Sequence, residues 1–114
     1  MKKSVKGRAI QTGLPWNLRI SLNGHASFPI NATFESHIRR NKDDVTPLVI
    51  LTTANGGVVR TGSKQISLSV SAAQSSNWTE GSVYLDVVRT DGDRLHLGFA
   101  LSIYVNKPIT RFLV

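Results

Sequence analysis

The sequence predicts an all-β protein, an antiparallel immunoglobulin-like β-sandwich of seven or eight strands. Every odd position from Leu95 to Val105 is apolar, and the positions between them are small, polar or amphipathic. Successive side chains of a strand point to opposite faces, so this period of two indicates a strand buried on one side. The alternation recurs in four other segments, separated by turn signals. Short alternating strands with turns between them are typical of a sandwich, and a partly open barrel is the alternative.

The first half of the chain predicts three strands. Alternation over residues 14–22 indicates a strand that is entered at Pro15, and Asn23–Gly24 is a reversal signal. A second strand follows up to residue 39, before a polar loop over 39–44. Residues 45–53 are apolar on both faces, which predicts a central strand. The inward side chains of the second strand are expected to be Ile30, Ala32, Phe34 and Ile38.

The second half predicts the remaining elements. Residues 55–57 form a turn into a short segment at 58–60, and residues 65–71 alternate again. Only residues 71–78 break the strand rhythm, and Ser71 is placed to cap at most one short helical turn there. Strands over 83–87 and 95–105 follow, and a last short piece spans 109–113.

Parity predicts the connection between the two last long strands. A two-residue loop at residues 91–92 would put their apolar side chains on opposite faces of the sheet, which burial forbids. A three-residue loop over 91–93, with Gly92 or its neighbour in a left-handed conformation, restores agreement. The pairs then expected are Val87 with Leu97, Leu85 with Phe99, Val83 with Leu101, Asp86 with Gly98 and Tyr84 with Ala100.

In this register Asp86 lies in mid-sheet on the outer side. The missing side chain of Gly98 leaves room above it, and a carboxylate there can accept hydrogen bonds from a neighbouring strand, a loop or Arg111. We therefore expect structural roles for Asp86, Gly98, Arg111 and the turn residue Gly92. A solvated Asp86 is the alternative.

The charge is concentrated at one end of the chain. Residues 1–42 contain eight Lys or Arg and one acidic residue, whereas six basic and six acidic residues balance over the rest, so the net charge of +7 belongs to the first third. A chain of 114 residues fits one core. We predict a basic N-terminal arm over 1–13 and a single domain over 14–114. The residues expected to bind an acidic neighbouring subunit are Lys2, Lys3, Lys6 and Arg8; a solvated face with a loose tail is the alternative.

Motifs for catalysis or cofactor binding are absent from the sequence. It contains no Gly-x-Ser-x-Gly elbow, no Gly-rich phosphate loop before a helix and no cysteine for a thiolate site. His25 lies in a predicted turn, and His37 and His96 occupy outward strand positions. The carboxylate pairs at 43–44 and at 91 and 93 lie in loops, where turn formation explains them. We expect no enzyme activity, no cofactor and no metal.

The sequence also bears on partners and location. No apolar run is long enough to span a membrane, and no apolar stretch follows the basic start as in a signal peptide, so we expect no membrane partner and no secretion by that route. Tyr84 and Tyr104 are outward by parity and can contact a protein or stack on bases. The sequence has no RNA-recognition motif, so nucleic acid is the less favoured partner.

A series of motifs in this chain resembles a known family. In chain order they are the strand from Ile30–Asn31 to Arg39, Asn55–Gly56–Gly57, Ile66–Ser67–Leu68–Ser69, Trp78, the stretch from Gly81 to Val87, Asp91–Gly92, Leu97–Gly98, Val105 and the stretch from Pro108 to Arg111. Over residues 14–111 the chain is similar to small β-sandwich virion proteins of tailed bacteriophages, in particular the N-terminal domain of baseplate upper proteins and related tail or head accessory proteins. The part from Trp78 to Arg111 is the most specific. The basic arm is not a feature of that family.

The resemblance implies a non-enzymatic virion protein, made in the host cytoplasm, that joins or stabilises tail or baseplate components. Its implied partners are other virion proteins and copies of itself in a symmetric assembly. A head-decoration or capsid-stabilising protein is the close alternative. A nucleic-acid-binding accessory protein is the alternative from another class.

Overall fold

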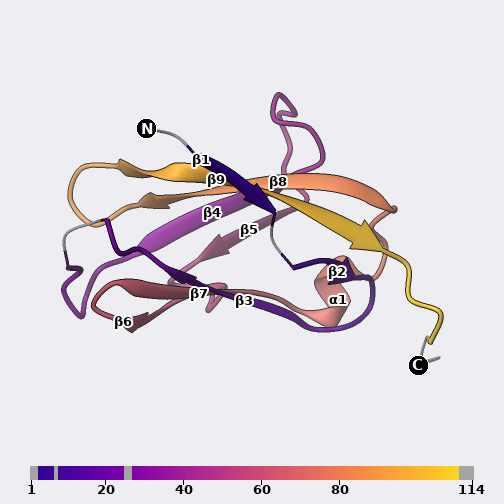
Figure 1. Cartoon of the computed structure of the whole chain (residues 1–114), viewed down its shortest axis with the longest axis horizontal. Helices are drawn as coiled ribbons and strands as arrows, with labels where there is room; N and C mark the ends of the chain where they lie inside the picture. Colours follow the sequence, from indigo (N-terminus) through magenta and orange to yellow (C-terminus); the bar gives the residue numbers. More distant parts are fainter. Residues whose placement is uncertain (1–2, 7, 25–26, 111–114) are drawn as a thin grey trace.

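Two β-sheets pack face to face in this protein (Figure 1). The computed structural model describes residues 3–6, 8–24 and 27–110, and of residues 3–6 it describes the backbone alone. One sheet has six strands and the other has three within these residues. The predicted all-β, immunoglobulin-like sandwich is confirmed.

The six-stranded sheet has the order β1-β9-β8-β4-β5, and β2 also pairs with β9. Neighbouring strands are antiparallel, except that β1 and β2 run parallel to β9. The sequence had predicted antiparallel pairing throughout, and the two parallel pairings with β9 correct that expectation. Its strands are β1 (Lys3–Lys6), β2 (Ile10–Gln11), β4 (Phe34–Arg39), β5 (Val49–Thr52), β8 (Gly81–Arg89) and β9 (Leu95–Asn106).

The three-stranded sheet has the antiparallel order β3-β7-β6. Its strands are β3 (Trp16–Ser21), β6 (Val58–Gly62) and β7 (Gln65–Val70). Because β3 and β4 lie in different sheets, the turn that begins at Asn23–Gly24 leads across the sandwich and not into a hairpin. This strand order, with strands close in sequence divided between two sheets, is that of an immunoglobulin-like domain.

The core lies between the inner faces of the two sheets. β4 and β7 bury every second side chain, which is the pattern of a strand covered on one face. Ser36 is the exception in β4, a buried serine whose hydroxyl has no hydrogen-bond partner within the described residues. The largest fully buried apolar side chains are Ile10, Phe34, Ile38, Leu51, Val58, Ile66, Leu68, Val70, Val83, Val87, Leu97 and Ile103.

The predicted helical turn is confirmed as α1 (Ala72–Ser75). Ser71 Oγ accepts a hydrogen bond from the Gln74 N–H at 3.1 Å, and Gln74 Oε1 accepts one from the Ser71 N–H at 2.8 Å. This reciprocal capping box begins the helix. The turn also places the buried Ser75 Oγ 3.1 Å from the Gly13 N–H, which ties the segment after β2 to α1.

The N-terminal segment differs from the expected basic arm over 1–13 that precedes the domain. β1 pairs with residues 99–102 of β9, and β2 pairs with residues 105–106. Ile10 is fully buried, and the Trp16 Nε1–H donates to the Arg8 carbonyl at 2.8 Å. The domain therefore begins before residue 14. Two- and four-residue strands are too short for an alternating pattern to reveal them.

Two predicted strand positions are wrong. Ile30 is 87% exposed, because the Ala32 N–H donates to the Pro29 carbonyl in a turn and β4 begins only at Phe34. The segment over 45–53 is not a central strand: β5 is the edge strand of its sheet, and Ile50 is 43% exposed on its outer side.

Asn55 covers the open edge of β5. Its Nδ2 donates to the Ile50 carbonyl and its Oδ1 accepts from the Thr52 N–H, both at 2.9 Å. A neighbouring strand would offer the same pair of donor and acceptor, so the amide of Asn55 occupies the place of the next strand. An edge protected in this way resists pairing with another chain.

The β8–β9 hairpin follows the predicted register only near its turn. Val88 pairs with His96, as the three-residue loop requires, and Gly92 has a φ of 75° in that loop. Between Asp86 and Val88 the register shifts, because three residues of β9 around Gly98 lie opposite the single residue Val87. Gly98 has a φ of 84°, which marks this as a β-bulge.

Beyond the bulge the predicted pairs are wrong by two residues. Asp86 pairs with Ala100 instead of Gly98, and Tyr84 pairs with Ser102 instead of Ala100. A shift of two keeps the parity of the strand, so the apolar side chains still face the core. The corrected apolar pairs are Leu85 with Leu101 and Val83 with Ile103.

Gly57→Ala is expected to lower the free energy of unfolding by about 1–3 kcal/mol. A Cβ atom at Gly57 would lie 2.7 Å from Leu51 Cβ and 2.9 Å from Leu51 Cα. Leu51 is a buried residue of β5 and cannot retreat from the contact. Gly24→Ala is the control, because a Cβ at Gly24 meets nothing within 4 Å. Urea unfolding midpoints that fall equally in both variants would contradict this packing.

Candidate functional site

The candidate site lies on the outer face of the six-stranded sheet, the face turned away from the core. We call this surface the outer face. Alternate residues of β4, β5, β8 and β9 point to it, and they are partly or fully exposed. Its central residues are Glu35, His37, Arg39, Ile50, Tyr84, Asp86, His96, Ala100, Ser102 and Tyr104.

Tyr84 and Tyr104 both lie on the outer face, as parity predicts. Tyr84 pairs with Ser102 and Tyr104 pairs with Ser82, so the two rings are diagonal neighbours on adjacent strands. Tyr104 is 50% exposed. The Lys42 Nζ atom lies over the ring of Tyr84, 5.4 Å from its centroid, which is a cation–π contact.

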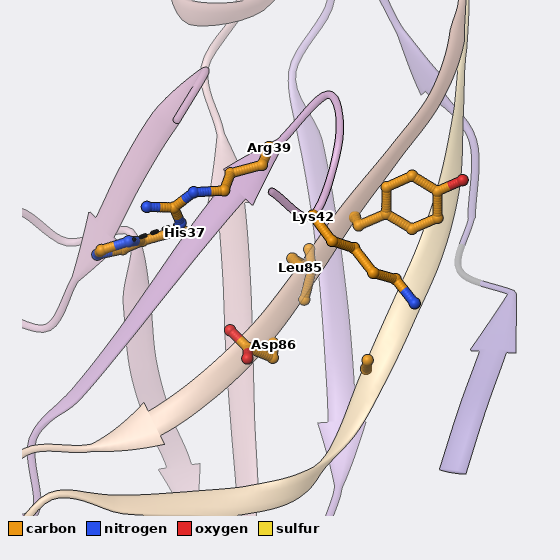
Figure 2. Close-up of a pocket in the computed structure, with 7 residues that line it drawn as sticks. His37, Arg39, Lys42, Leu85 and Asp86 are labelled. Carbon is orange, nitrogen blue, oxygen red and sulfur yellow. Dashed lines mark hydrogen bonds between the residues drawn. The ribbon is translucent and has the colours of Figure 1, made fainter. Parts of the chain in front are cut away.

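A shallow hollow of about 220 Å³ lies beside Tyr84. Figure 2 shows Lys42 extending from the loop after β4 over β8, with Asp86 projecting from β8 farther along the strand. Arg40 anchors this loop, because its guanidinium donates to the carbonyls of Thr79 and Ser82. The hollow is lined by His37, Arg39, Lys42, Tyr84, Leu85, Asp86 and Ala100.

His37 is held between the carboxylate of Glu35 and the guanidinium of Arg39, both on β4. Arg39 donates from its guanidinium to His37 Nδ1 at 3.0 Å, and His37 Nε2 lies 2.5 Å from Glu35 Oε2. A guanidinium can only donate, so Nδ1 is the acceptor and Nε2 carries the hydrogen that bonds Glu35. Arg39 Nε also donates to the Asp44 carbonyl at 2.8 Å, which fixes the direction of the side chain.

His96 is held in the same way beside the bulge. The Gly98 N–H donates to His96 Nδ1 at 2.8 Å, and His96 Nε2 lies 2.8 Å from Asp86 Oδ2. A backbone N–H can only donate, so His96 also carries its hydrogen on Nε2. The partner of Asp86 is thus a side chain of the neighbouring strand, one of the three partners that the sequence suggested.

Both histidine rings therefore have their two nitrogen atoms engaged in hydrogen bonds. Neither ring forms a hydrogen bond with a serine or threonine hydroxyl within residues 8–24 and 27–110. The same residues contain no group of three His, Asp or Glu side chains arranged to hold a metal ion. What the outer face offers is charge of both signs, two tyrosine rings and a small hollow.

The other predicted partner-binding residues and Arg111 are not among the side chains that the structure shows on this face. Lys2 and Arg111 lie outside the described residues. Lys3 and Lys6 belong to β1, and only their backbone is described. Arg8 is exposed, and its carbonyl is bound to Trp16. The sequence did not indicate Lys42 as a site residue, because a loop residue is not assigned to a face by strand alternation. The outward positions of His37 and Arg39 on the preceding strand were the available signal for this part of the face.

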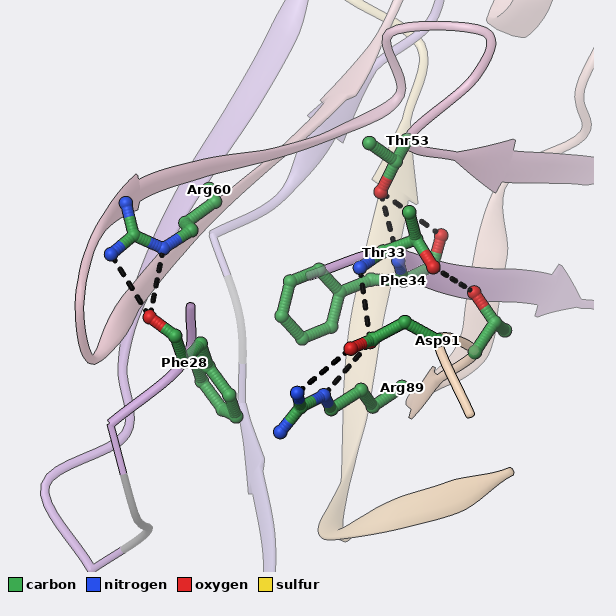
Figure 3. A network of polar contacts seen from close by, with 8 residues as sticks. Phe28, Thr33, Phe34, Thr53, Arg60, Arg89 and Asp91 are labelled. Carbon is green, nitrogen blue, oxygen red and sulfur yellow. Dashed lines mark hydrogen bonds and ion pairs between the residues drawn. The ribbon is translucent and has the colours of Figure 1, made fainter. Parts of the chain in front are cut away.

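A second polar network lies at one end of the sandwich, where the connection over residues 27–33 meets the β8–β9 loop (Figure 3). Arg89 donates to both carboxylate oxygens of Asp91 at 2.8 Å, and the Thr33 N–H donates to Asp91 at 3.1 Å. The Arg89 guanidinium also lies over the ring of Phe28, 5.5 Å from its centroid, and Phe28 packs edge-on against Phe34. These contacts hold the β8–β9 loop against the connection that leads into β4.

The ion pair shifts the titration of both partners. The hydrogen bond from Arg89 holds the pKa of Asp91 well below its usual range, and the Thr33 N–H lowers it further. Desolvation opposes this shift. The hydrogen bond to Asp91 likewise raises the pKa of Arg89. Asp91, expected from the sequence to be a turn former, therefore also connects the turn to the segment that leads into β4.

No protein-family model and no curated protein matches this chain. In the part of the chain that the structure describes, no helix has the length and apolar character needed to cross a membrane.

Asp91→Asn is expected to lower stability at neutral pH, and the difference from the parent is expected to shrink in acid. The pKa of Asp91 is depressed in the folded state, so the ionised carboxylate contributes stability above the unfolded value of about 3.9. This contribution is lost as the pH falls through the folded value. Urea midpoints measured from pH 7 down to about pH 2 check the prediction.

Asp93→Asn is the matched control, because it removes the same charge from the same loop. Asp93 makes no hydrogen bond or ion pair among the described residues. A loss of stability at pH 7 that is the same for Asp91→Asn and Asp93→Asn would contradict the role of the ion pair with Arg89.

Proposed function

We propose that this chain is a structural protein of a bacteriophage particle, a non-enzymatic module that joins or stabilises components of the tail or baseplate. The resemblance of residues 14–111 to small virion sandwich proteins supports the phage assignment. The immunoglobulin-like sandwich is compatible with it, because this architecture serves many proteins as a rigid frame for contacts with other proteins.

The composition of the outer face is the observation that carries the interaction role. Tyr84 and Tyr104 lie diagonally on adjacent strands, and the cations Lys42 and Arg39 flank Tyr84. Tyrosine and arginine are enriched where proteins recognise one another, because they combine a large apolar area with hydrogen bonds. The basic residues Lys2, Lys3, Lys6 and Arg8 are a second proposed contact, with an acidic surface of a neighbouring subunit.

The same tyrosine rings and cations would also suit a single-stranded nucleic acid. The carboxylates of Glu35 and Asp86 lie on the same face, however, and would repel a polyanion. The outer face therefore favours a protein partner. Salt-dependent retention of DNA by the intact protein would favour the nucleic-acid role instead.

The test is the position and copy number of this chain in purified phage particles, measured by electron cryomicroscopy and quantitative mass spectrometry. We expect copies in multiples of three or six at the tail, because tail components share its rotational symmetry. On the order of hundreds of copies over the shell would assign the same module to the head. Absence of the chain from intact particles would contradict the proposal.

A further inference from the structure

The outer face presents complementary features side by side. A hollow of about 220 Å³ lies next to Tyr84, and the half-exposed ring of Tyr104 projects two residue pairs farther along the same two strands. By strand geometry this pair lies about 7 Å from that of Tyr84. A surface with a recess and a projecting ring so close together can fit a copy of itself.

The charges on this face are complementary as well. The hollow is lined by two cations, Arg39 and Lys42, and by the carboxylate of Asp86. All seven acidic residues of the chain lie in its described part, and none of them forms an ion pair with Lys42 or Arg39. Lys42 instead rests on the Tyr84 ring, and Asp86 accepts from the ring of His96. Cations and carboxylate thus line one hollow without pairing with each other.

We propose that the outer face binds a second copy of this chain about a twofold axis. Such an axis brings the same patch of both copies together, so every contact between two different residues across the interface occurs twice. Lys42 of one copy then faces Asp86 of the other, and the reciprocal pair forms at the same time. The projecting Tyr104 rings lie against the partner's hollow.

The features of the hollow argue against other occupants. Its volume is below the roughly 300–1,000 Å³ of typical small-molecule pockets, and it suits one or two protein side chains. An acidic peptide or a nucleic acid would meet the carboxylates of Asp86 and Glu35. A molecule that measures 43 by 27 by 24 Å has a face large enough for the roughly 800 Å² per partner of a stable interface.

The inference rests on the proposed function, because it names one partner of the interaction module. The two can nevertheless fail separately. Self-association is measured with the pure protein, whereas the virion role is measured in particles.

Sedimentation velocity of the full chain over a range of concentrations is the test. The parent is expected to form dimers with a dissociation constant on the order of micromolar. Lys42→Glu creates two like-charge contacts in each dimer, and Asp86→Lys does the same, so each is expected to weaken dimerisation about tenfold. An equimolar mixture of the two variants restores both opposite-charge pairs and is expected to recover dimers of mixed composition. The variant with both substitutions is expected to recover homodimers.

Arg19→Glu is the matched control. Arg19 is an exposed cation on β3, in the opposite sheet, and its substitution changes the net charge as much as Lys42→Glu. It is expected to leave dimerisation unchanged. Because Asp86→Lys removes the acceptor of His96, circular dichroism checks its fold. If that variant does not fold, Lys42→Glu and Tyr104→Ala decide the question, and both must weaken dimerisation.

A parent chain that stays monomeric at all concentrations would overturn the inference and leave the virion role standing. Equal weakening by Arg19→Glu and Lys42→Glu would also overturn it, since net charge alone would then explain the effect. Dimers that behave as expected, in a chain absent from phage particles, would support this interface and refute the proposed function.

Discussion

The pairing of β9 with β8 is the interaction on which the rest of this structure depends. β9 contributes four buried side chains to the core, and its other edge receives β1 and β2. The strand could not do this with a simple one-residue bulge, because every apolar side chain beyond Gly98 would then turn to the outer face. A shift of two residues lets the strand bend and still keep Leu101, Ile103 and Val105 inside.

The same bulge determines the chemistry of the outer face. It sets Ala100 against Asp86, so a small side chain lies where the hollow forms. It also directs the Gly98 N–H to the ring of His96, whose other nitrogen bonds Asp86. Because parity is kept, Tyr84 and Tyr104 remain on one side of the sheet. The proposed contacts with other proteins thus rely on a backbone irregularity at one glycine.

Most of the fold could be predicted from the sequence, because alternation reports directly on burial. The strand of Leu95 to Val105, the capped turn at Ser71 and the left-handed Gly92 were all accessible in this way. The edge position of β5 was not. An apolar run cannot distinguish a central strand from an edge strand whose open backbone groups are satisfied by a side-chain amide of the following turn, here that of Asn55. The bulge was hidden because a shift of two leaves the apolar pattern unchanged. The hollow requires Lys42, a loop residue that no periodicity places.

Cross-strand nuclear Overhauser contacts between backbone protons of β8 and β9 test this register most directly. The bulged register predicts contacts of Tyr84 with Ser102 and of Asp86 with Ala100, together with Val88 and His96 on the turn side of Gly98. Contacts of Asp86 with Gly98 and of Tyr84 with Ala100 would mean a straight ladder. That result would contradict the bulged register, on which this account of the outer face rests.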